Sequence, residues 1–282
     1  MLAMLAFAGN SLLCRLALKH TAIDAASFTT VRLVSASLVL CLLAGGWRTQ
    51  WRTKWHITWQ GGGNWPSAVA LFAYAVGFSF AYINLPAATG ALLLFGAVQA
   101  TMIGYGIWMG ERLVPLQLAG VGLAGGGLAA LMLPGLAAPP LGSAILMLGS
   151  GVAWGVYSLR GKGAPSASSP VTVTSGNFMR TVPLTLGLSL IMINHLSLDA
   201  AGVGYGVMSG ALTSGVGYVI WYKALPALKA TSAATVQLSV PVIAALGGVV
   251  FIGEPFSVRL VLASFAILAG IALVILYKKQ IQ

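Results

Sequence analysis

Ten long apolar segments joined by short polar links dominate this chain. In the first half they cover residues 2–18, 27–44, 65–83, 89–109 and 114–133, and in the second half residues 141–159, 171–193, 203–222, 231–252 and 258–277. A transmembrane helix needs about 17 to 25 predominantly apolar residues. Only 7% of the 282 residues are charged, whereas a soluble domain carries about 25%. The sequence therefore predicts an all-α integral membrane protein with ten transmembrane helices.

The Lys and Arg residues fall mainly on one side of the predicted membrane. With the N-terminus in the cytoplasm, ten of them lie in cytoplasmic loops or ends, and three, Arg15, Lys19 and Arg259, lie on the other side. Positive charge accumulates on the cytoplasmic side, so both termini are predicted to be cytoplasmic. The formal charge of +11 is scattered without a basic helix or recognition motif, which argues against a nucleic-acid partner. The predicted partners are the lipid bilayer and a small molecule.

Two further arginines lie inside predicted spans. Arg32 lies about six residues into its span, close enough to the interface for its side chain to snorkel outward. Arg180 lies about ten residues in, so its charge needs an anionic or carbonyl partner. It either binds a substrate carboxylate or braces helix ends. Bracing is the favoured interpretation, because most intramembrane charges face partners within the bundle.

The two halves of the chain repeat one design. Aromatic residues at a spacing of four precede a Leu-Pro pair in the first half (Tyr74, Phe78, Tyr82, Pro86), and the spacing recurs 140 residues later (Ser214, Tyr218, Tyr222, Pro226). Gly110-Glu111 is likewise matched by Gly253-Glu254. Because each half has an odd number of spans, the second repeat, residues 136–282, must insert upside down relative to the first, residues 1–135. Inverted repeats are common in secondary transporters, which bind substrate near the midplane between the halves. The pattern predicts alternating access to a central cavity; an accidental or purely structural duplication is the alternative.

Small residues at a spacing of four predict where helices approach closely. They occur in three stripes: Gly122/Gly126/Ala130, Gly202/Gly206/Gly210 and Ala266/Gly270. For the fifth and tenth spans, a dimer interface is the alternative to packing within the chain.

Polar residues near the middle of spans are the first candidates for substrate contacts. Asn10 and Gln99 lie near the centres of the first and fourth spans; each either lines a ligand site or makes an interhelical hydrogen bond. In the ninth span Pro241 is expected in the helix interior, where its ring would displace the carbonyl of Gln237. That freed carbonyl, the Gln237 amide and Ser239 together predict a polar site with Pro241 as its hinge. A kink satisfied by neighbouring helices is the alternative.

Aromatic residues are the second set of candidates. Phe78, Trp154 and Tyr218 lie deep in their spans and are predicted to form cavity walls. Tyr74, Tyr82 and Tyr222 lie near span ends, where Tyr and Trp are usual at the membrane interface. Belt residues are therefore the alternative interpretation for those three.

The positions of the titratable residues argue against several kinds of chemistry. All four acidic residues, Asp24, Glu111, Asp199 and Glu254, lie in loops or at helix ends, as do the three histidines. Proton relays use such residues within the membrane, so the sequence predicts transport without a buried-carboxylate relay. An enzyme would need a nucleophile with a base, or metal ligands, converging within the spans. No catalytic residue, metal or cofactor is predicted, and Cys14 and Cys41 are interpreted as small core residues.

These features resemble the drug/metabolite transporter superfamily in its ten-helix EamA-type branch. The resemblance covers nearly the whole chain and rests on the five-plus-five repeat, on Gly110-Glu111-Arg112, and on the run from Ala233-Ala234-Thr235-Val236 through Pro241 to Gly253-Glu254-Pro255. Within the branch, Trp154-Gly155-Val156-Tyr157 and the Tyr74/Phe78/Tyr82 stripe resemble the bacterial aromatic amino acid exporters.

The resemblance implies a multi-pass exporter of the bacterial cytoplasmic (inner) membrane. Amino acids, aromatic and other, or related small metabolites are the implied cargo, with broad specificity, and a monomer is favoured. A drug or nucleotide-precursor transporter of the same fold is the alternative. The positions that match the family's cavity helices are Asn10, Phe78, Tyr82, Gln99, Trp154, Tyr218 and Gln237.

Overall fold

The structure is a computed structural model that describes residues 1–44, 62–110, 112–133, 138–162, 169–224, 236–255 and 257–277. The helices are α1 (Leu2–His20), α2 (Ala25–Ala44), α4 (Trp65–Tyr82), α5 (Ala87–Trp108), α6 (Pro115–Met132), α7 (Leu141–Lys162), α8 (Pro170–Ile191), α9 (Ala200–Met208), α10 (Gly217–Ala224), α12 (Ser239–Ile252) and α13 (Val258–Tyr277). A π-helical segment, η2 (Ser209–Val216), joins α9 to α10, and a short 3₁₀ turn, η1 (Ile193–His195), follows α8. The described residues are thus helices and their connections. Glu111, the start of the ninth predicted span at 231–235, Pro226 and the predicted repeat boundary at 135/136 lie outside the described residues.

Eight of the helical segments are long and apolar enough to cross a membrane. These are α1, α2, α4, α5, α6, α7, α13 and the continuous segment Ala200–Trp221 formed by α9, η2 and α10. The other two predicted spans do not meet the same standard for different reasons. In α8 the buried face carries Thr174, Ser175, Asn177, Thr181 and Thr185, which lowers its hydropathy, and α12 is described over only 14 residues. The chain is an all-helical, multi-pass membrane protein.

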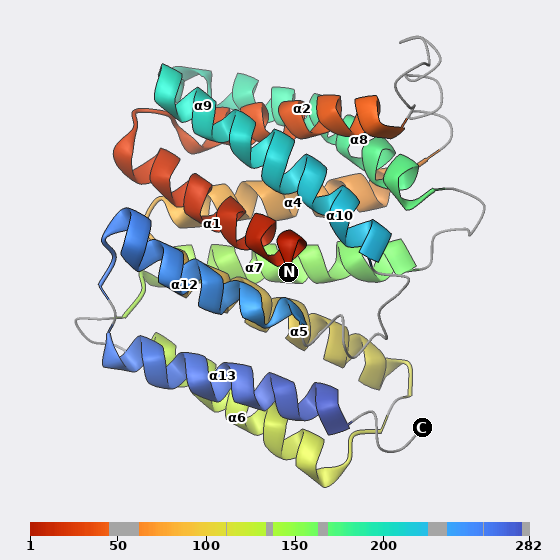
Figure 1. Ribbon diagram of the computed structural model, residues 1–282, viewed down its shortest axis with the longest axis vertical. Helices are drawn as coiled ribbons and strands as arrows, with labels where there is room; N and C mark the ends of the chain where they lie inside the picture. Colours follow the sequence, from red (N-terminus) through yellow and green to blue (C-terminus); the bar gives the residue numbers. More distant parts are fainter. Residues whose placement is uncertain are drawn as a thin grey trace.

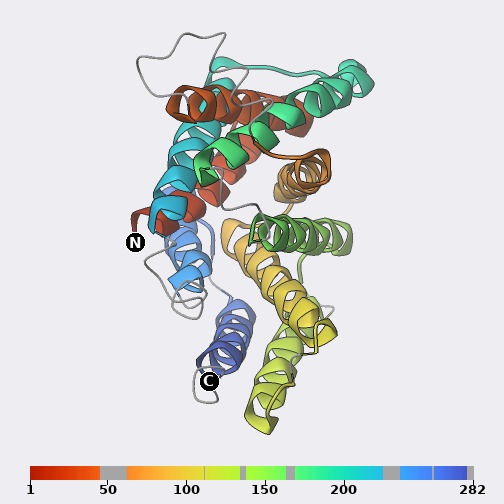
Figure 2. The same ribbon diagram turned by 90° about the vertical axis from the view of Figure 1, so that its right-hand side faces the viewer.

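The helices lie across the long axis of the molecule in successive pairs (Figure 1). α2 packs on α8, α1 packs on α12 and on the α9–α10 segment, and α7 packs on α4 and α5. α6 and α13 pair with each other at the far end of the molecule, away from α2 and α8 (Figure 2). Each of these contacts joins a helix of the first half of the chain to one of the second half. The core therefore lies between the halves.

Glycines set the closest of these approaches. A methyl group on Gly206 would meet Val31, and one on Gly210 would meet the carbonyl oxygen of Arg32. The predicted stripe is therefore confirmed as a close-packing surface: Gly206 and Gly210 pack on α2, and Gly202 packs on Ile23 just before it. On α6 the predicted stripe does not pack within the described chain, and a dimer interface there stays a prediction. A methyl group on Gly122 or Gly126 would meet no atom of the described chain within 4 Å, whereas Gly120 and Gly127 face Gly270 and Ala266 of α13.

Two other glycines end helices at corresponding places in the two halves. Gly110 follows α5 with φ of +92°, and Gly253 follows α12 with φ of +67°. This left-handed conformation favours glycine because a Cβ would be strained there. Each is followed by a glutamate in the sequence. The glycines of the two matched landmarks therefore share a left-handed conformation as well as a place in the residue pattern.

Candidate functional site

A continuous group of aromatic rings lies between the two halves of the chain; we refer to it as the aromatic cluster. Its members come from α1, α4, α7, α8 and α10 and are Phe7, Tyr74, Phe78, Tyr82, Trp154, Tyr157, Phe178, Tyr218 and Trp221. Trp154 connects the rings of α4 to those of α10, because its ring centroid lies 4.9 Å from that of Tyr74 and 5.3 Å from that of Tyr218. The structure thus brings together Phe78, Tyr82, Trp154 and Tyr218, four of the predicted site residues.

The same cluster rules out the belt interpretation for two tyrosines. Tyr74 is 7% exposed and Tyr82 is fully buried, because the face of α4 that carries them is turned toward α7 and α1. Each also uses its hydroxyl internally: Tyr82 donates to the carbonyl oxygen of Ala87 at 3.3 Å, and Tyr74 accepts from Asn10. The interpretation of these two as belt residues is wrong. The side chain of Tyr222 lies outside the described residues.

Asn10 links three helical segments beside the cluster. Its Nδ2 donates to the Tyr74 hydroxyl at 3.3 Å, and its Oδ1 accepts from the Ser209 hydroxyl at 2.6 Å. The Thr213 hydroxyl lies 3.3 Å from the same oxygen. Ser209 and Thr213 both belong to η2, and π-helical segments often occur at functional sites. Of the two roles considered for Asn10, the structure shows the interhelical hydrogen bonds. These bonds lie beside Tyr74 of the aromatic cluster.

Arg32 lies against the same group of side chains. The residue is only 2% exposed, and its guanidinium carbon lies 5.3 Å from the ring centroid of Tyr74 and 4.9 Å from that of Phe78. The prediction that Arg32 snorkels to the interface is wrong, because α2 presents this residue to α4 and η2 rather than to lipid. Its Nε and Nη1 atoms are buried and have no hydrogen-bond partner among the described residues.

The remaining predicted site residues lie on α5 and near the start of α12. Gln99 is 3% exposed on α5, and Gln237 and Ser239 are half-buried. The Ser239 hydroxyl donates to the carbonyl of Val236 at 2.7 Å. Pro241 lies in the first turn of α12, which begins at Ser239 after a turn at Leu238. First-turn N–H groups have no acceptor within their own helix, so a proline costs no hydrogen bond there. The hydrogen bonds and ring contacts of the aromatic cluster do not involve these four residues, and their roles stay predictions.

An ion pair joins several helix ends at one end of the molecule. Arg15 Nε donates to Glu254 Oε1 at 3.0 Å, and the two side chains are only 11% and 7% exposed. The other carboxylate oxygen, Oε2, accepts from the backbone N–H of Ala87 at 2.7 Å. Arg15 Nη1 also donates to the carbonyls of Tyr82 and Ile83, both at 2.9 Å. One charge pair thus joins the ends of α1, α4, α5 and α12; we refer to it as the terminal ion pair.

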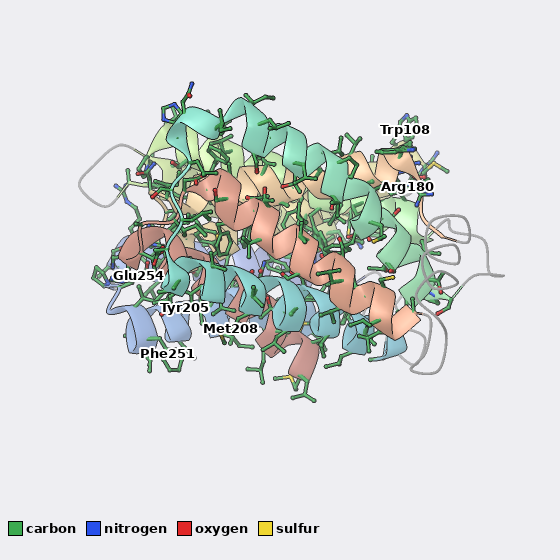
Figure 3. The ribbon with its side chains drawn as sticks, turned by 90° about the horizontal axis from the view of Figure 1, so that it is seen from above. Trp108, Arg180, Tyr205, Met208, Phe251 and Glu254 are labelled. Carbon is green, nitrogen blue, oxygen red and sulfur yellow. The ribbon has the colours of Figure 1, made fainter. Side chains whose placement is uncertain are left out.

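Arg180 lies at the opposite end of the molecule from Glu254 (Figure 3). Its Nη1 donates to the carbonyl of Gly62 at 2.8 Å and to that of Gly176 at 2.9 Å. The interpretation that Arg180 braces helix ends is therefore confirmed, since it ties α8 to the residues that precede α4.

Asp24, in the connection between α1 and α2, holds two loops together at the Glu254 end. Its carboxylate accepts from the backbone N–H groups of Ala26 and Ser27, both at 2.9 Å, and from that of Ser197 at 3.0 Å. Partial burial raises the pKa of this carboxyl, but the hydrogen bonds from Ser197, Ser27 and Ala26 together outweigh burial and leave the pKa below its usual value. Asp24 thus caps the start of α2 and links it to the loop that contains Ser197.

Sequence reasoning did not identify several residues that the structure places at these sites. Ser209 and Thr213 are recognisable in the sequence only as hydroxyls four residues apart, a spacing that aligns them on one helix face. The sequence pattern places Arg32 at the membrane interface and Glu254 in a loop, and it gives neither a partner. A cleft of about 160 Å³ beside Glu254, lined mainly by α5, α12 and the start of α13, was not predicted either.

Comparisons with known proteins agree on a transporter. The EamA-like transporter family matches residues 141–276. An uncharacterized protein of Pseudomonas aeruginosa is 52% identical over 97% of this chain and 92% of its own length. A threonine/homoserine exporter of Escherichia coli is 30% identical over 44% of this chain, which spans less than half (42%) of that exporter's length. A probable terminal-alkyne amino-acid exporter of Streptantibioticus cattleyicolor is 28% identical over 66% of this chain and 63% of its own length.

The fold has a counterpart among solved structures. One crystal structure superposes with a TM-score of 0.63 over 99% of this chain and 99% of its own, at 18% identity. At that identity the likeness shows a common fold and nothing of the cargo. Together with the matched family and the amino-acid exporters, it leads to one conclusion: this chain is a small-molecule transporter of the drug/metabolite transporter superfamily, in the EamA-like family.

Proposed function

We propose that the protein exports amino acids, aromatic and other, and related small metabolites across the bacterial cytoplasmic membrane. In this proposal, residues 1–135 and 136–282 are two inverted five-helix repeats that expose a central site to each side in turn. The single observation that carries the proposal is the location of the aromatic cluster and the Asn10 hydrogen bonds, which lie where the two halves meet. A site at that interface can be opened from either side by moving one half against the other.

The pairing of helices supports the inverted repeat. A twofold relation between the repeats exchanges α1 with α7, α4 with the α9–α10 segment, and α5 with α12. Contacts of α1 with α12 and α9–α10 then have counterparts in contacts of α7 with α5 and α4, and both sets are present. The same twofold relation exchanges α2 with α8 and α6 with α13. The contacts α2·α8 and α6·α13 are therefore each their own counterpart. Packing that obeys this exchange is expected for two oppositely inserted copies of one design.

The chemistry of the interface supports a small amphipathic cargo. Tyr74 of the aromatic cluster contacts the Asn10 amide, which also bonds to the hydroxyls of Ser209 and Thr213, and apolar surroundings with a few polar groups are usual for a small-molecule site. Two of the relatives are named as exporters of amino acids, which favours amino acids over a drug or a nucleotide precursor. Asp24 and Asp199 lie at helix ends, and the buried carboxylate of Glu254 is already paired with Arg15. Exchange or facilitated transport is therefore proposed in place of a buried-carboxylate proton relay.

Counterflow in liposomes tests the cargo. Purified protein is reconstituted with a panel of amino acids inside, and uptake of the radiolabelled compounds is followed. We expect uptake of several neutral amino acids, and loss of most of it in Trp154→Ala. Trp108→Ala is the matched control, because Trp108 is 80% exposed near the end of α5 (Figure 3). Flux confined to a lipophilic cation or a nucleoside would overturn the amino acid assignment.

Cysteine labelling tests the inverted repeat. Arg112 and Pro255 are exposed and follow the two Gly-Glu landmarks. In a background without the two native cysteines, Arg112→Cys and Pro255→Cys are treated in whole cells with a membrane-impermeant maleimide. We expect labelling of Pro255→Cys from outside and of Arg112→Cys only after permeabilisation. Labelling of both positions from the same compartment would refute opposite insertion of the two halves.

A further inference from the structure

Arg32 is a cation buried between the two halves with nothing anionic to neutralise it in the part of the chain that the structure describes. Its side chain lies between α2 and α4 at 2% exposure, and the buried Nε and Nη1 donors have no acceptor among the same residues. A guanidinium carries its positive charge into the interior of a protein. The charge is thus buried while Nε and Nη1 lack an acceptor in the described chain, although the guanidinium also contacts the Tyr74 hydroxyl.

Of the three described carboxylates, two are fully engaged elsewhere. The third, Asp199, caps α9 by accepting from the N–H of Gly202 through Oδ2, while its buried Oδ1 has no partner among the described residues. Glu254 is paired with Arg15 and accepts from Ala87 N–H. Asp24 precedes Arg32 at the start of α2 and accepts from three backbone N–H groups. Among the residues that the structure describes, the terminal ion pair is the one salt bridge present.

The aromatic rings next to Arg32 compensate only part of its charge. The guanidinium carbon lies within 5.3 Å of the ring centroids of Tyr74 and Phe78, close enough for cation–π attraction. Rings accept no strong hydrogen bond, so they leave the Nε and Nη1 donors unsatisfied. Buried groups with unmet hydrogen-bonding capacity are retained at functional sites more readily than in scaffolds.

We propose that Arg32 binds the carboxylate of the transported solute, an assignment that rests on the proposed function. A guanidinium N–H donates a charge-assisted hydrogen bond to a carboxylate oxygen, which is about twice as strong as a bond between neutral groups. The Tyr74 hydroxyl and the Asn10 amide, joined at 3.3 Å, lie on the same side of the interface because Tyr74 contacts both Asn10 and Arg32. The substrate class is then a small carboxylate, such as a neutral amino acid. A lipophilic cation is repelled from the same place.

A ligand series on the unaltered protein gives the first test. Counterflow of radiolabelled phenylalanine and threonine is measured against unlabelled competitors: each amino acid, its amide and its alcohol. Because losing one partner of a buried charge pair weakens binding strongly, we expect the amides and alcohols to compete at least about 30-fold more weakly than the acids. Equal competition by acid and amide would overturn the assignment without any variant being made.

Variants give the second test. Arg32→Gln should lose the discrimination between acid and amide to within about threefold, and Arg32→Lys, which keeps the charge, should retain part of it. Discrimination that survives unchanged in Arg32→Gln contradicts the assignment. Arg180→Gln is the matched control: its guanidinium already donates to the carbonyls of Gly62 and Gly176, so the variant should melt at a lower temperature yet keep the discrimination.

The melting temperature without solute separates binding from scaffolding. Removing a buried charge that lacks a partner should leave the fold as stable or more stable, so Arg32→Gln and Arg32→Met should melt no lower than the unaltered protein. If both variants fail to fold or melt much lower, the chain itself compensates the charge of Arg32, and the assignment is overturned.

A failure of the proposed function is distinguishable from a failure of this inference. If the unaltered protein exchanges no amino acid, the proposed cargo is wrong, and Arg32 is tested by melting with millimolar benzoate or benzamide. A rise with benzoate alone that disappears in Arg32→Gln supports an anion site for another carboxylate. No rise with benzoate overturns the inference as well.

Discussion

The terminal ion pair gives the sharpest prediction about how the protein opens. Glu254 accepts from Arg15 at 3.0 Å and from the backbone N–H of Ala87 at 2.7 Å, so one carboxylate ties the end of α12 to α1 and to the start of α5. Both charged side chains are nearly buried. Replacing Glu254 with Ala should therefore release three helices at one end of the molecule and favour conformations that are open there.

The size of the effect follows from what remains after the substitution. Breaking a buried pair by removing one partner costs about 3–5 kcal/mol when the other charge is left uncompensated. Arg15 keeps its bonds to the carbonyls of Tyr82 and Ile83, so we expect a smaller cost of about 2–3 kcal/mol in the closed state. At about 1.4 kcal/mol for each factor of ten, the open population should rise by about 30- to 150-fold.

Cys14 provides the measurement, because it directly precedes Arg15 and is fully buried. In a Cys41→Ser background, a membrane-impermeant maleimide reacts with Cys14 only when this end opens. The reaction rate is then the opening equilibrium multiplied by the intrinsic rate, so Glu254→Ala should raise it by about the same 30- to 150-fold. Glu254→Gln keeps one carbonyl acceptor and should give a smaller rise.

Two controls separate opening from general loosening. Lys19→Gln removes an exposed charge from the same end of α1 and should leave the rate within about threefold, since exposed charges contribute little. In a Cys14→Ser background, buried Cys41 should react no faster in Glu254→Ala than without it. If Cys14 and Cys41 accelerate equally, the protein is unfolding globally. If Cys14 does not accelerate at all in a folded Glu254→Ala protein, the ion pair does not hold this end closed.

Three other predictions concern the scaffold, each measured by unfolding in detergent micelles. Asn10→Leu should lower the free energy of unfolding by about 1–3 kcal/mol, because hydroxyls that it serves lose their partner; adding Ser209→Ala should recover part of the loss, and no recovery would argue against that contact. Asp24→Ala should cost about 1 kcal/mol as a lost cap, whereas Asp24→Asn should cost less. Folding lowers the pKa of the Asp24 carboxyl. Its contribution to the free energy of unfolding is therefore complete above the unfolded pKa of about 3.9 and disappears as the pH falls through the lower folded pKa. A curve of stability against pH between 7 and 3 should be flatter for Asp24→Ala, and parallel curves would contradict this. Gly210→Ala should cost about 1–3 kcal/mol or more because the methyl group overlaps α2, whereas Gly204→Ala, with open space around it, should not destabilise.

The general architecture was accessible from the sequence because the bilayer imposes it. A lipid-embedded backbone must satisfy its hydrogen bonds within the chain, so each long apolar run has to be a helix. The predicted spans 65–83 and 258–277 accordingly match α4 (Trp65–Tyr82) and α13 (Val258–Tyr277) closely. The predicted span 171–193 also matches α8 (Pro170–Ile191), although the buried face of α8 is rich in Thr and Ser. A polar face of this kind is tolerated in a membrane because it packs against other helices and not against lipid. Hydropathy averaged along the helix does not show which face that is.

Part of the candidate site was also accessible, because a spacing of four aligns side chains on one helix face. Tyr74, Phe78 and Tyr82 do form one stripe, and the stripe meets Trp154. The sequence did not determine which way a uniformly apolar helix turns. On α6 the face with Gly120 and Gly127, not the predicted face with Gly122 and Gly126, packs on α13.

The two arginines within spans show why depth in a helix is a weaker guide than direction. Arg32 is nearer to the start of its span than Arg180 is, and depth alone predicted that Arg32 would reach water. The reverse holds for exposure: Arg32 is buried against Tyr74 and Phe78, whereas Arg180 is half-buried and bonded to the carbonyls of Gly62 and Gly176. Snorkelling requires a path along the lipid-facing side of the helix, and α2 turns Arg32 to the opposite side. Arg32 faces inward, and its Nε and Nη1 have no acceptor among the described residues, which is why the ligand series at Arg32 tests both the proposed site and the direction in which α2 faces.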